Sequence, residues 1–283
     1  MYEKHIYEGF VKISQYLGGN TSYVQGGGGN TSAKLQADRM LVKASGLLLK
    51  DVTHDKGFAN VDYSTICKFL QKFEAEEDIF NAQIISSNTI PEFRPSMETG
   101  FHAVLGKYVV HSHSVFANVL NCAVEGQSLV RDIFPDAAWI PYASPGKSLT
   151  LGVQSFVNSK IFFLGNHGVI VHGRSADAVI EAHEELNNRL CNELQLPNFD
   201  QTQCHEYGRE FMNEHILFPD QVIYTNPDSN FDGSSLQQDI FAAYAYIHSQ
   251  IDRLHLKPHY LNQRDAAFLL NMDAEKYRAK VLD

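Results

Sequence analysis

The sequence predicts an α/β protein, and three observations indicate this class. Runs of β-forming residues at 40–46 and 108–110 have the composition of strands. Apolar residues recur every three or four positions within residues 3–17, a spacing typical of an amphipathic helix. Glycine and asparagine interrupt the apolar segment 160–172, which favours two short strands joined by a turn. Strands and helices should therefore alternate along the first two thirds of the 283 residues.

Further elements follow in chain order. Helices are predicted over residues 63–73, from 114 to 120, from 144 to 150, over 175–194 and over 237–254, and a short strand over 139–142. The helix at 175–194 has the clearest pattern. Its expected apolar face consists of Ala178, Ala182, Leu186 and Leu190. It also carries Glu181, His183, Glu184 and Glu185, which we interpret as solvated side chains on an exposed face and not as a metal site.

Composition limits the function classes. The formal net charge of −10, without a dense run of lysine or arginine, argues against nucleic acid as the main partner but is compatible with a phosphorylated substrate in a locally basic pocket. No apolar run approaches the roughly 18 residues of a membrane span, and we find no signal-peptide pattern. The cysteines, Cys67, Cys122, Cys191 and Cys204, are scattered, as expected for free thiols. We therefore expect a cytoplasmic protein that binds neither membranes nor nucleic acid.

The candidate chemistry lies between residues 94 and 120. His111 and His113 follow β-forming residues, and side chains two apart on a strand face the same side, so both imidazoles can converge on one divalent cation. Glu98 and His102, at helical spacing, would bring a carboxylate towards this cation. A His-x-His pair alone can also be a pair of core or surface residues. His167, on the glycine turn, supplies the third ligand that favours an open, catalytic zinc-type site.

A glycine run at 26–29 precedes a predicted strand. Free N–H groups in such a turn can form a nest for an anion, although a plain flexible hairpin loop explains the composition equally well. The run has neither the Walker A pattern nor the dinucleotide-binding fingerprint, so nucleotide binding is not indicated. The turn at Ser45 and Gly46 offers a further hydroxyl and exposed amides.

The sequence changes character after Pro197. Residues up to about 200 have the composition of a linker, and the remainder alternates helical stretches with turns. No catalytic constellation is evident there. We predict a catalytic domain at 1–197 and a mostly helical C-terminal appendage at 198–283, packed against the core or a neighbouring subunit.

Four motifs, read in this order, resemble the class II aldolase/adducin family over roughly residues 3–195. They are Gly-Gly-Asn-Thr-Ser at 28–32, Ser-Gly at 45–46, the stretch from Pro-Ser-x-Glu at 95–98 to His-x-His at 111–113, and Asn-His-Gly at 166–168. The segment Phe-Pro-Asp-Gln-Val-Ile at 218–223 resembles the aldolase half of larger rhamnulose-phosphate aldolase/dehydrogenase relatives.

The resemblance implies a three-layer α/β/α fold with a central, largely antiparallel sheet, commonly in a homotetramer with active sites between subunits. It implies His111, His113 and His167 as ligands of zinc or another divalent cation, and Glu98 as the catalytic acid/base. The implied phosphate-binding residues are Gly29, Asn30, Thr31, Ser45, Gly46 and Ser96. His102 matches a position that is not a ligand. Two features depart from the family pattern: Met97 follows Ser96 where a second hydroxyl is common, and Lys43 precedes the Ser-Gly turn.

The implied reaction is cleavage of a ketose 1-phosphate to dihydroxyacetone phosphate and an aldehyde, through an enediolate stabilised by the cation. Two alternatives remain. The same scaffold supports epimerisation or dehydration of a sugar phosphate, and adducin-like relatives use it as an interaction module without chemistry. Retention of all three histidines and Glu98 argues against the module.

Overall fold

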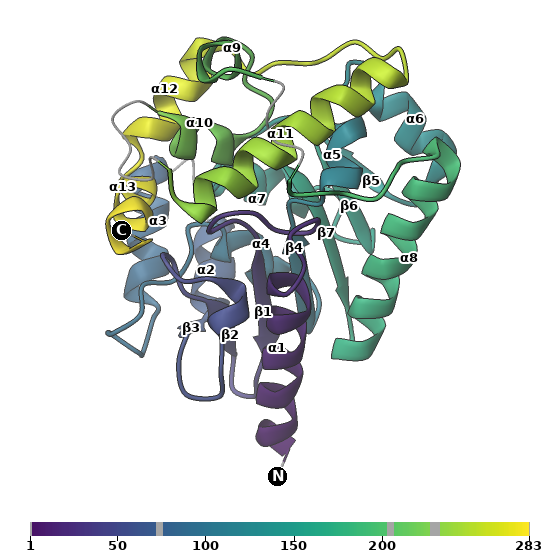
Figure 1. Ribbon diagram of the computed structural model, residues 1–283. Coiled ribbons are helices and arrows are strands. Elements are labelled where there is room, and N and C mark those ends of the chain that lie inside the picture. Colours follow the sequence, from purple (N-terminus) through teal and green to yellow (C-terminus); the bar gives the residue numbers. More distant parts are fainter. Residues whose placement is uncertain (1, 72–75, 203–206, 227–232, 283) are drawn as a thin grey trace.

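The computed structural model describes residues 2–71, 76–202, 207–226 and 233–282, and over these ranges it contains a seven-stranded sheet between layers of helices (Figure 1). The strand order is β3-β2-β1-β4-β7-β6-β5. Neighbouring strands are antiparallel except β5 and β6, which are parallel. The strands are β1 (Asn30–Lys34), β2 (Arg39–Lys43), β3 (Phe58–Asp62), β4 (Tyr108–Ser112), β5 (Ala138–Ile140), β6 (Ile161–Leu164) and β7 (Gly168–Gly173). The predicted α/β fold with a largely antiparallel sheet is confirmed.

Alternation along β4 divides the core between the two faces of the sheet. Tyr108 and Val110 pack in the cluster under α1 (Tyr2–Gly18) and α8 (Ala176–Leu194), whereas Val109 packs in a cluster on the other face. The helices of that other face are α2 (Tyr63–Leu70), α3 (Glu77–Ser86), α4 (Thr99–Val104) and α7 (Lys147–Gln154). The remaining helices of this part are η1 (Leu49–Asp51), α5 (Val115–Asn121) and α6 (Gly126–Ile133).

The C-terminal helices lie across one end of the sheet (Figure 1). They are α9 (Arg209–Glu214), α10 (Pro219–Thr225), α11 (Ser235–Arg253), α12 (Gln263–Asn271) and α13 (Asp273–Leu282). Their buried residues form one apolar cluster together with Met97, Val115 and Val119 of the preceding part of the chain. Among the described residues, no helix combines the length and apolarity that a membrane crossing requires.

Most predicted elements are present, with some differences. Helix α3 was not expected, because its apolar residues show little helical periodicity. The predicted helix at 63–73 is described only to residue 71, so Phe73 lies outside the described residues, as does Glu74 of the acidic run beside it. Cys67, Cys122 and Cys191 are free, as expected, and Cys204 also lies outside the described residues.

The expected environment of His183 was wrong. Glu181, Glu184 and Glu185 are exposed as predicted, but His183 is buried, and its Nε2 lies 2.7 Å from the Ser112 hydroxyl of β4. The inward face of α8 is rotated from the predicted one: Val179 and His183 are buried, whereas Ala178 is exposed. The expectation was wrong because His183 was counted as a polar residue in the helical pattern. A neutral imidazole with a hydrogen-bond partner can occupy a core position.

The contact between α1 and η1 leads to a stability prediction. A Cβ at Gly18 would lie 2.1 Å from the Lys50 nitrogen and 2.6 Å from the Leu49 carbonyl carbon. Alanine is the better helix former by about 1 kcal/mol, yet relieving a backbone clash costs about 1–3 kcal/mol, so we expect Gly18→Ala to destabilise the fold. Urea denaturation measures the change in unfolding free energy. Gly208→Ala is the control, because no atom of the neighbouring described residues lies within 4 Å of its Cβ position. Equal stability of the two variants would contradict the predicted clash.

Candidate metal centre and cavity

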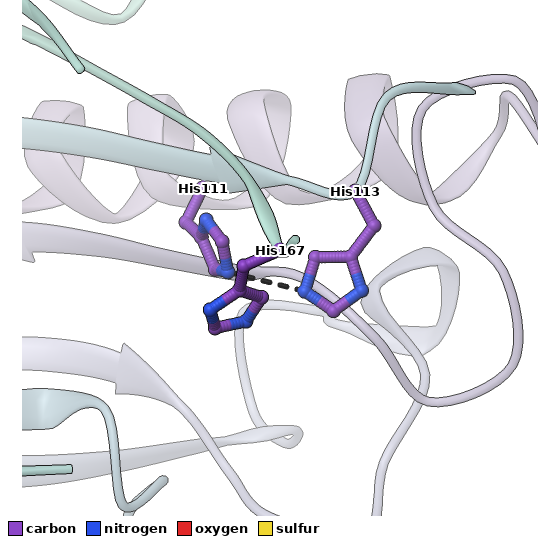
Figure 2. A group of neighbouring side chains, drawn as sticks. All are labelled: His111, His113 and His167. Carbon is purple, nitrogen blue, oxygen red and sulfur yellow. Dashed lines mark hydrogen bonds between the residues drawn. The ribbon is translucent and has the colours of Figure 1, made fainter. Parts of the chain in front are cut away.

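Three histidines converge at the end of β4 (Figure 2). His111 is two residues after Val109, so its ring lies on the α4 side of the sheet, and His113 follows just beyond the strand. His167 lies in the turn between β6 and β7, next to Asn166, whose φ of 53° is a left-handed conformation that asparagine tolerates. Each ring offers one nitrogen atom as a ligand, and these three nitrogen atoms lie within 4.8 Å of one another. The structure thus brings together the three residues that the sequence proposed as ligands.

Hydrogen bonds of the outer nitrogens determine where the ring protons lie. Nδ1 of His111 is 3.0 Å from the Val169 carbonyl, and Nδ1 of His113 is 2.7 Å from a carboxylate oxygen of Asp220. Both partners accept only, so each Nδ1 carries the proton and each Nε2 presents a lone pair. These two Nε2 atoms lie 3.1 Å apart (Figure 2). Two facing lone pairs repel each other, and a cation relieves the repulsion, so this donor set fits a divalent metal.

The pKa values favour neutral ligands. Burial and the neighbouring histidines hold the pKa of His111 well below its usual range, and burial lowers the pKa of His167 to about 3. Both rings are therefore neutral at physiological pH, as metal coordination requires. His102 is buried against the Ser32 hydroxyl, 2.8 Å away, and lies outside the histidine cluster, in agreement with its predicted non-ligand role.

The carboxylate of Glu98 lies beside the histidine cluster. Its Oε1 lies 3.3 Å from Nε2 of His167, and its Oε2 accepts a hydrogen bond of 2.5 Å from the Asn30 amide. Asn30 is placed for this contact because it pairs with His111 across the β1–β4 ladder. The spacing of Glu98 and His102 suggested that both lie in one helix. In the structure, Glu98 immediately precedes α4. Burial raises the pKa of Glu98 to about 7, although His113 and Asn30 partly oppose the shift.

A cavity with about 470 Å³ of empty space lies beside these residues. Most of the residues predicted from the sequence line it, namely Gly29, Asn30, Ser45, Ser96, Glu98, His113 and His167. Lys43 also lines it. This lysine is buried, its ammonium group donates to the Gly27 carbonyl at 2.9 Å, and burial together with the charge of Arg278 lowers its pKa to about 8. The cavity therefore contains a cation close to the serine hydroxyls.

Two of the predicted phosphate-binding residues do not line this cavity. Thr31 points to the opposite face of β1, where its hydroxyl is 2.6 Å from that of Ser14. Gly46 is not among the lining residues, and a Cβ there would lie 2.7 Å from Val281 of α13. In the glycine run, the Gly27 N–H donates to the Tyr224 hydroxyl at 2.7 Å and the Gly28 N–H to a local carbonyl. These two amides are thus already paired.

The C-terminal helices supply residues that sequence reasoning missed. Asp220 of α10 contacts His113, and Glu275 and Arg278 of α13 line the same cavity. Arg278 donates a hydrogen bond to Asp220 at 2.7 Å and forms an ion pair with Glu275 at 2.8 Å. Two local signals included Asp220: the segment 218–223, whose resemblance implied no role for this residue, and an acidic residue after a proline at the start of a helix, which is also common without any functional role.

Comparisons with known proteins agree with this fold. The model of the Class II Aldolase and Adducin N-terminal domain matches residues 8–192, more than half of the chain. The protein therefore belongs to the class II aldolase and adducin family. No relative was found among curated proteins.

Solved structures show the same fold at low sequence identity. The chain resembles the N-terminal class II aldolase domain of a conserved protein from Thermoplasma acidophilum, with 24% identity and a TM-score of 0.59 over 65% of this chain and 92% of that one. It is also similar to YgbL from Klebsiella pneumoniae, with 22% identity and a TM-score of 0.51 over 70% and 92%. An aldolase II superfamily protein from Pseudomonas syringae, at 14% identity and a TM-score of 0.51, is matched over 88% of this chain and 94% of its own.

The histidine cluster predicts metal binding with a defined stoichiometry. We expect about one zinc-like cation per chain, because three imidazoles with an open position are a typical catalytic ligand set. His113→Ala should lose this cation, whereas His215→Ala, which removes a partly exposed histidine just after α9, should retain it. Elemental analysis of the purified proteins measures both. Equal metal content in His113→Ala and the wild type would exclude the assignment.

Proposed function

We propose that the protein is a metal-dependent aldolase that cleaves a ketose 1-phosphate to dihydroxyacetone phosphate and an aldehyde. The observation that carries this proposal is the position of Glu98: a buried carboxylate with a raised pKa lies between the three histidines and a cavity that contains serine hydroxyls and a lysine. Family membership supports the reaction class. We propose phosphate binding on the basis of the cavity lining.

His111, His113 and His167 would hold zinc or another divalent cation. When bound, such a cation polarises the substrate carbonyl and stabilises negative charge on its oxygen. Burial keeps His111 and His167 neutral, as coordination of a cation requires.

Glu98 is assigned the proton transfer. Asn30 holds Oε2, while Oε1 is buried and makes no hydrogen bond to any residue that the structure describes, so it is available to a substrate proton. A pKa near 7 suits a group that must both accept and return a proton at neutral pH. In the cleavage direction Glu98 accepts the proton of the substrate hydroxyl that becomes the aldehyde oxygen, and the carbon–carbon bond breaks with its electron pair passing to the carbon next to the carbonyl. The aldehyde leaves, and Glu98 gives the proton to that carbon of the remaining three-carbon fragment.

Ser45, Ser96 and Lys43 are proposed to bind the phosphate. All three line the cavity, and Lys43 is its buried cation. A lysine binds phosphate as a compact point charge, while hydroxyl groups add directional hydrogen bonds. The residue that the family pattern did not predict at position 43 thus supports an anionic substrate. Gly29, Asn30, Thr31 and Gly46, which the sequence also suggested, would act by shaping this region.

Epimerisation or dehydration on the same scaffold is the second candidate. YgbL, to which the fold is similar, is described by three alternative activities, aldolase, epimerase or decarboxylase. These reactions share negative charge on the carbon next to a carbonyl and differ in which bond at or beside that carbon breaks. An adducin-like module without chemistry would have no need for the Glu98 environment. A homotetramer, the assembly implied by the family resemblance, stays a prediction.

Replacement of the buried cation tests phosphate binding. Lys43→Met should raise KM for a phosphorylated ketose about 10- to 100-fold, because a hydrogen bond to a charged group contributes about 1.5–3 kcal/mol. Lys34→Met is the matched control, since Lys34 is a partly buried lysine of β1 that donates to the Ala103 and Leu105 carbonyls and does not line the cavity. Steady-state kinetics on the phosphorylated and unphosphorylated sugar measure the effect. Equal KM values of the wild type for the two sugars would sink the phosphate assignment.

A glycine variant is a weaker test of the same binding site. Gly29 has a φ of 71°, and a Cβ there would lie 2.9 Å from the His111 carbonyl oxygen. A β-branched residue at this position should raise KM but would also strain the strand that carries the metal ligands. Ser45→Ala avoids this complication.

Substitution of the proposed proton carrier separates proton transfer from cleavage. Glu98→Gln retains size and hydrogen bonding but cannot take up a proton, so kcat should fall about 10²–10⁴-fold while the metal is retained. The decisive measurement is exchange of the substrate α-proton with deuterated water. Glu77→Gln, which alters a half-buried carboxylate of raised pKa that accepts from the Lys147 amide, serves as the control. Wild-type exchange in metal-replete Glu98→Gln would remove Glu98 from the mechanism, and exchange without cleavage in the wild type would favour an epimerase.

A further inference from the structure

Asp220 links the C-terminal helices to the histidine cluster. It is the second residue of α10, it is 2% exposed, and it lies outside the range 8–192 that matches the family model. Its two oxygens have different partners: Oδ2 lies 2.7 Å from Nδ1 of His113, and Oδ1 accepts from Arg278 at 2.7 Å. An acidic residue at a helix start usually interacts with the helix N-terminus. Each oxygen of Asp220 instead has a side-chain partner from elsewhere in the chain.

The contact with His113 has a chemical consequence. A carboxylate at Nδ1 can only accept, so it keeps the proton on Nδ1 and the lone pair on Nε2. Nε2 is the atom that faces His111 within the cluster. A ring that could choose either tautomer or rotate would present a lone pair there only part of the time, which weakens coordination.

Arg278 keeps Asp220 in the acceptor form. The Arg278 guanidinium donates to Oδ1 of Asp220 at 2.7 Å, and a hydrogen bond from a fixed positive charge favours the ionised carboxylate, which only accepts. Arg278 is itself held by Glu275, one helical turn away, at 2.8 Å. The pair joins α10 to α13, so the orientation of His113 depends on two helices of the C-terminal segment.

We propose that Asp220 is a positioning residue for His113, with Arg278 as its counter-ion, so that the C-terminal segment completes the metal centre. This inference rests on the metal site of the proposed function. It assigns to residues 219–282 a part in metal binding that neither the family model nor the sequence motifs indicate.

The test compares two variants that each remove one carboxylate charge from Arg278. Asp220→Asn loses the fixed acceptor at His113, whereas Glu275→Gln leaves the contact between Asp220 and His113 in place. Competition with a chromophoric chelator measures zinc affinity, and thermal unfolding of the metal-free proteins measures stability. We expect zinc affinity to fall about 10- to 100-fold in Asp220→Asn and to stay within a few-fold of the wild type in Glu275→Gln, even where both lose stability.

A second measurement does not depend on either variant folding. In the metal-free wild type, the nitrogen chemical shifts of labelled histidine, with His113 assigned through His113→Gln, report which ring nitrogen carries the proton. We expect protonated Nδ1 and unprotonated Nε2 at His113. The reverse tautomer would overturn the proposal.

The outcomes separate this inference from the proposed function. Absence of zinc binding in the wild type would remove the metal centre and the positioning role together. Tight zinc binding by the wild type with equal affinity in Asp220→Asn would overturn the positioning role alone. Equal loss of affinity in both variants would also overturn it, because the effect would then follow from weaker packing of α13 and not from the His113 contact.

Discussion

The pairing of β4 with β7 is the constraint on which the candidate site depends. His111 lies opposite Ile170 in this antiparallel ladder, and Ser112 lies opposite Val169. The register places the Val169 carbonyl where it accepts from Nδ1 of His111. Gly168 allows the strands this close an approach, because a Cβ there would lie 2.2 Å from the Ser112 carbonyl oxygen. The turn that carries His167 precedes Gly168 directly, so one strand pair positions two of the three imidazoles.

The C-terminal segment fixes the remaining parts of the site from outside the sheet. Leu217 and His259 accept hydrogen bonds from the side-chain amide of Asn166, beside His167. Asp220 contacts His113, and the Tyr224 hydroxyl accepts from the Gly27 amide in the glycine run. Each of these contacts fixes a loop at the end of the sheet that the strand pairing alone does not hold in place. Because the apolar cluster of the C-terminal helices extends into the preceding part of the chain, these contacts form together with the core.

Local sequence patterns predicted what depends on neighbours in the chain. The strand alternation around His111, the glycine turn at His167 and the four ordered motifs led to the fold and to the histidine cluster. They could not show that Asp220 or Arg278 reaches the same cavity, since those contacts join residues more than 50 positions apart. Nor could they orient side chains on a strand whose register was unknown: Thr31 and Asn30 are adjacent, yet only Asn30 faces Glu98. The burial of His183 has the same origin, because only the packed structure shows its hydroxyl partner.

The balance of buried charge explains why these distant residues belong to one site. An isolated buried charge is strongly unfavourable, so each charge needs a partner or must be neutralised. Arg278 satisfies this condition with two carboxylates, and the partners hold its pKa above the usual range despite burial. Among the described residues, the Asn30 amide donates to Glu98, and burial is the main cause of the raised pKa of this carboxyl. Nε2 of His111 and Nε2 of His113 lie 3.1 Å apart in the neighbouring cluster, with their lone pairs facing each other. A bound cation would stabilise both the ionised carboxylate and these lone pairs, so it would connect the protonation of Glu98 with the occupancy of the histidine cluster.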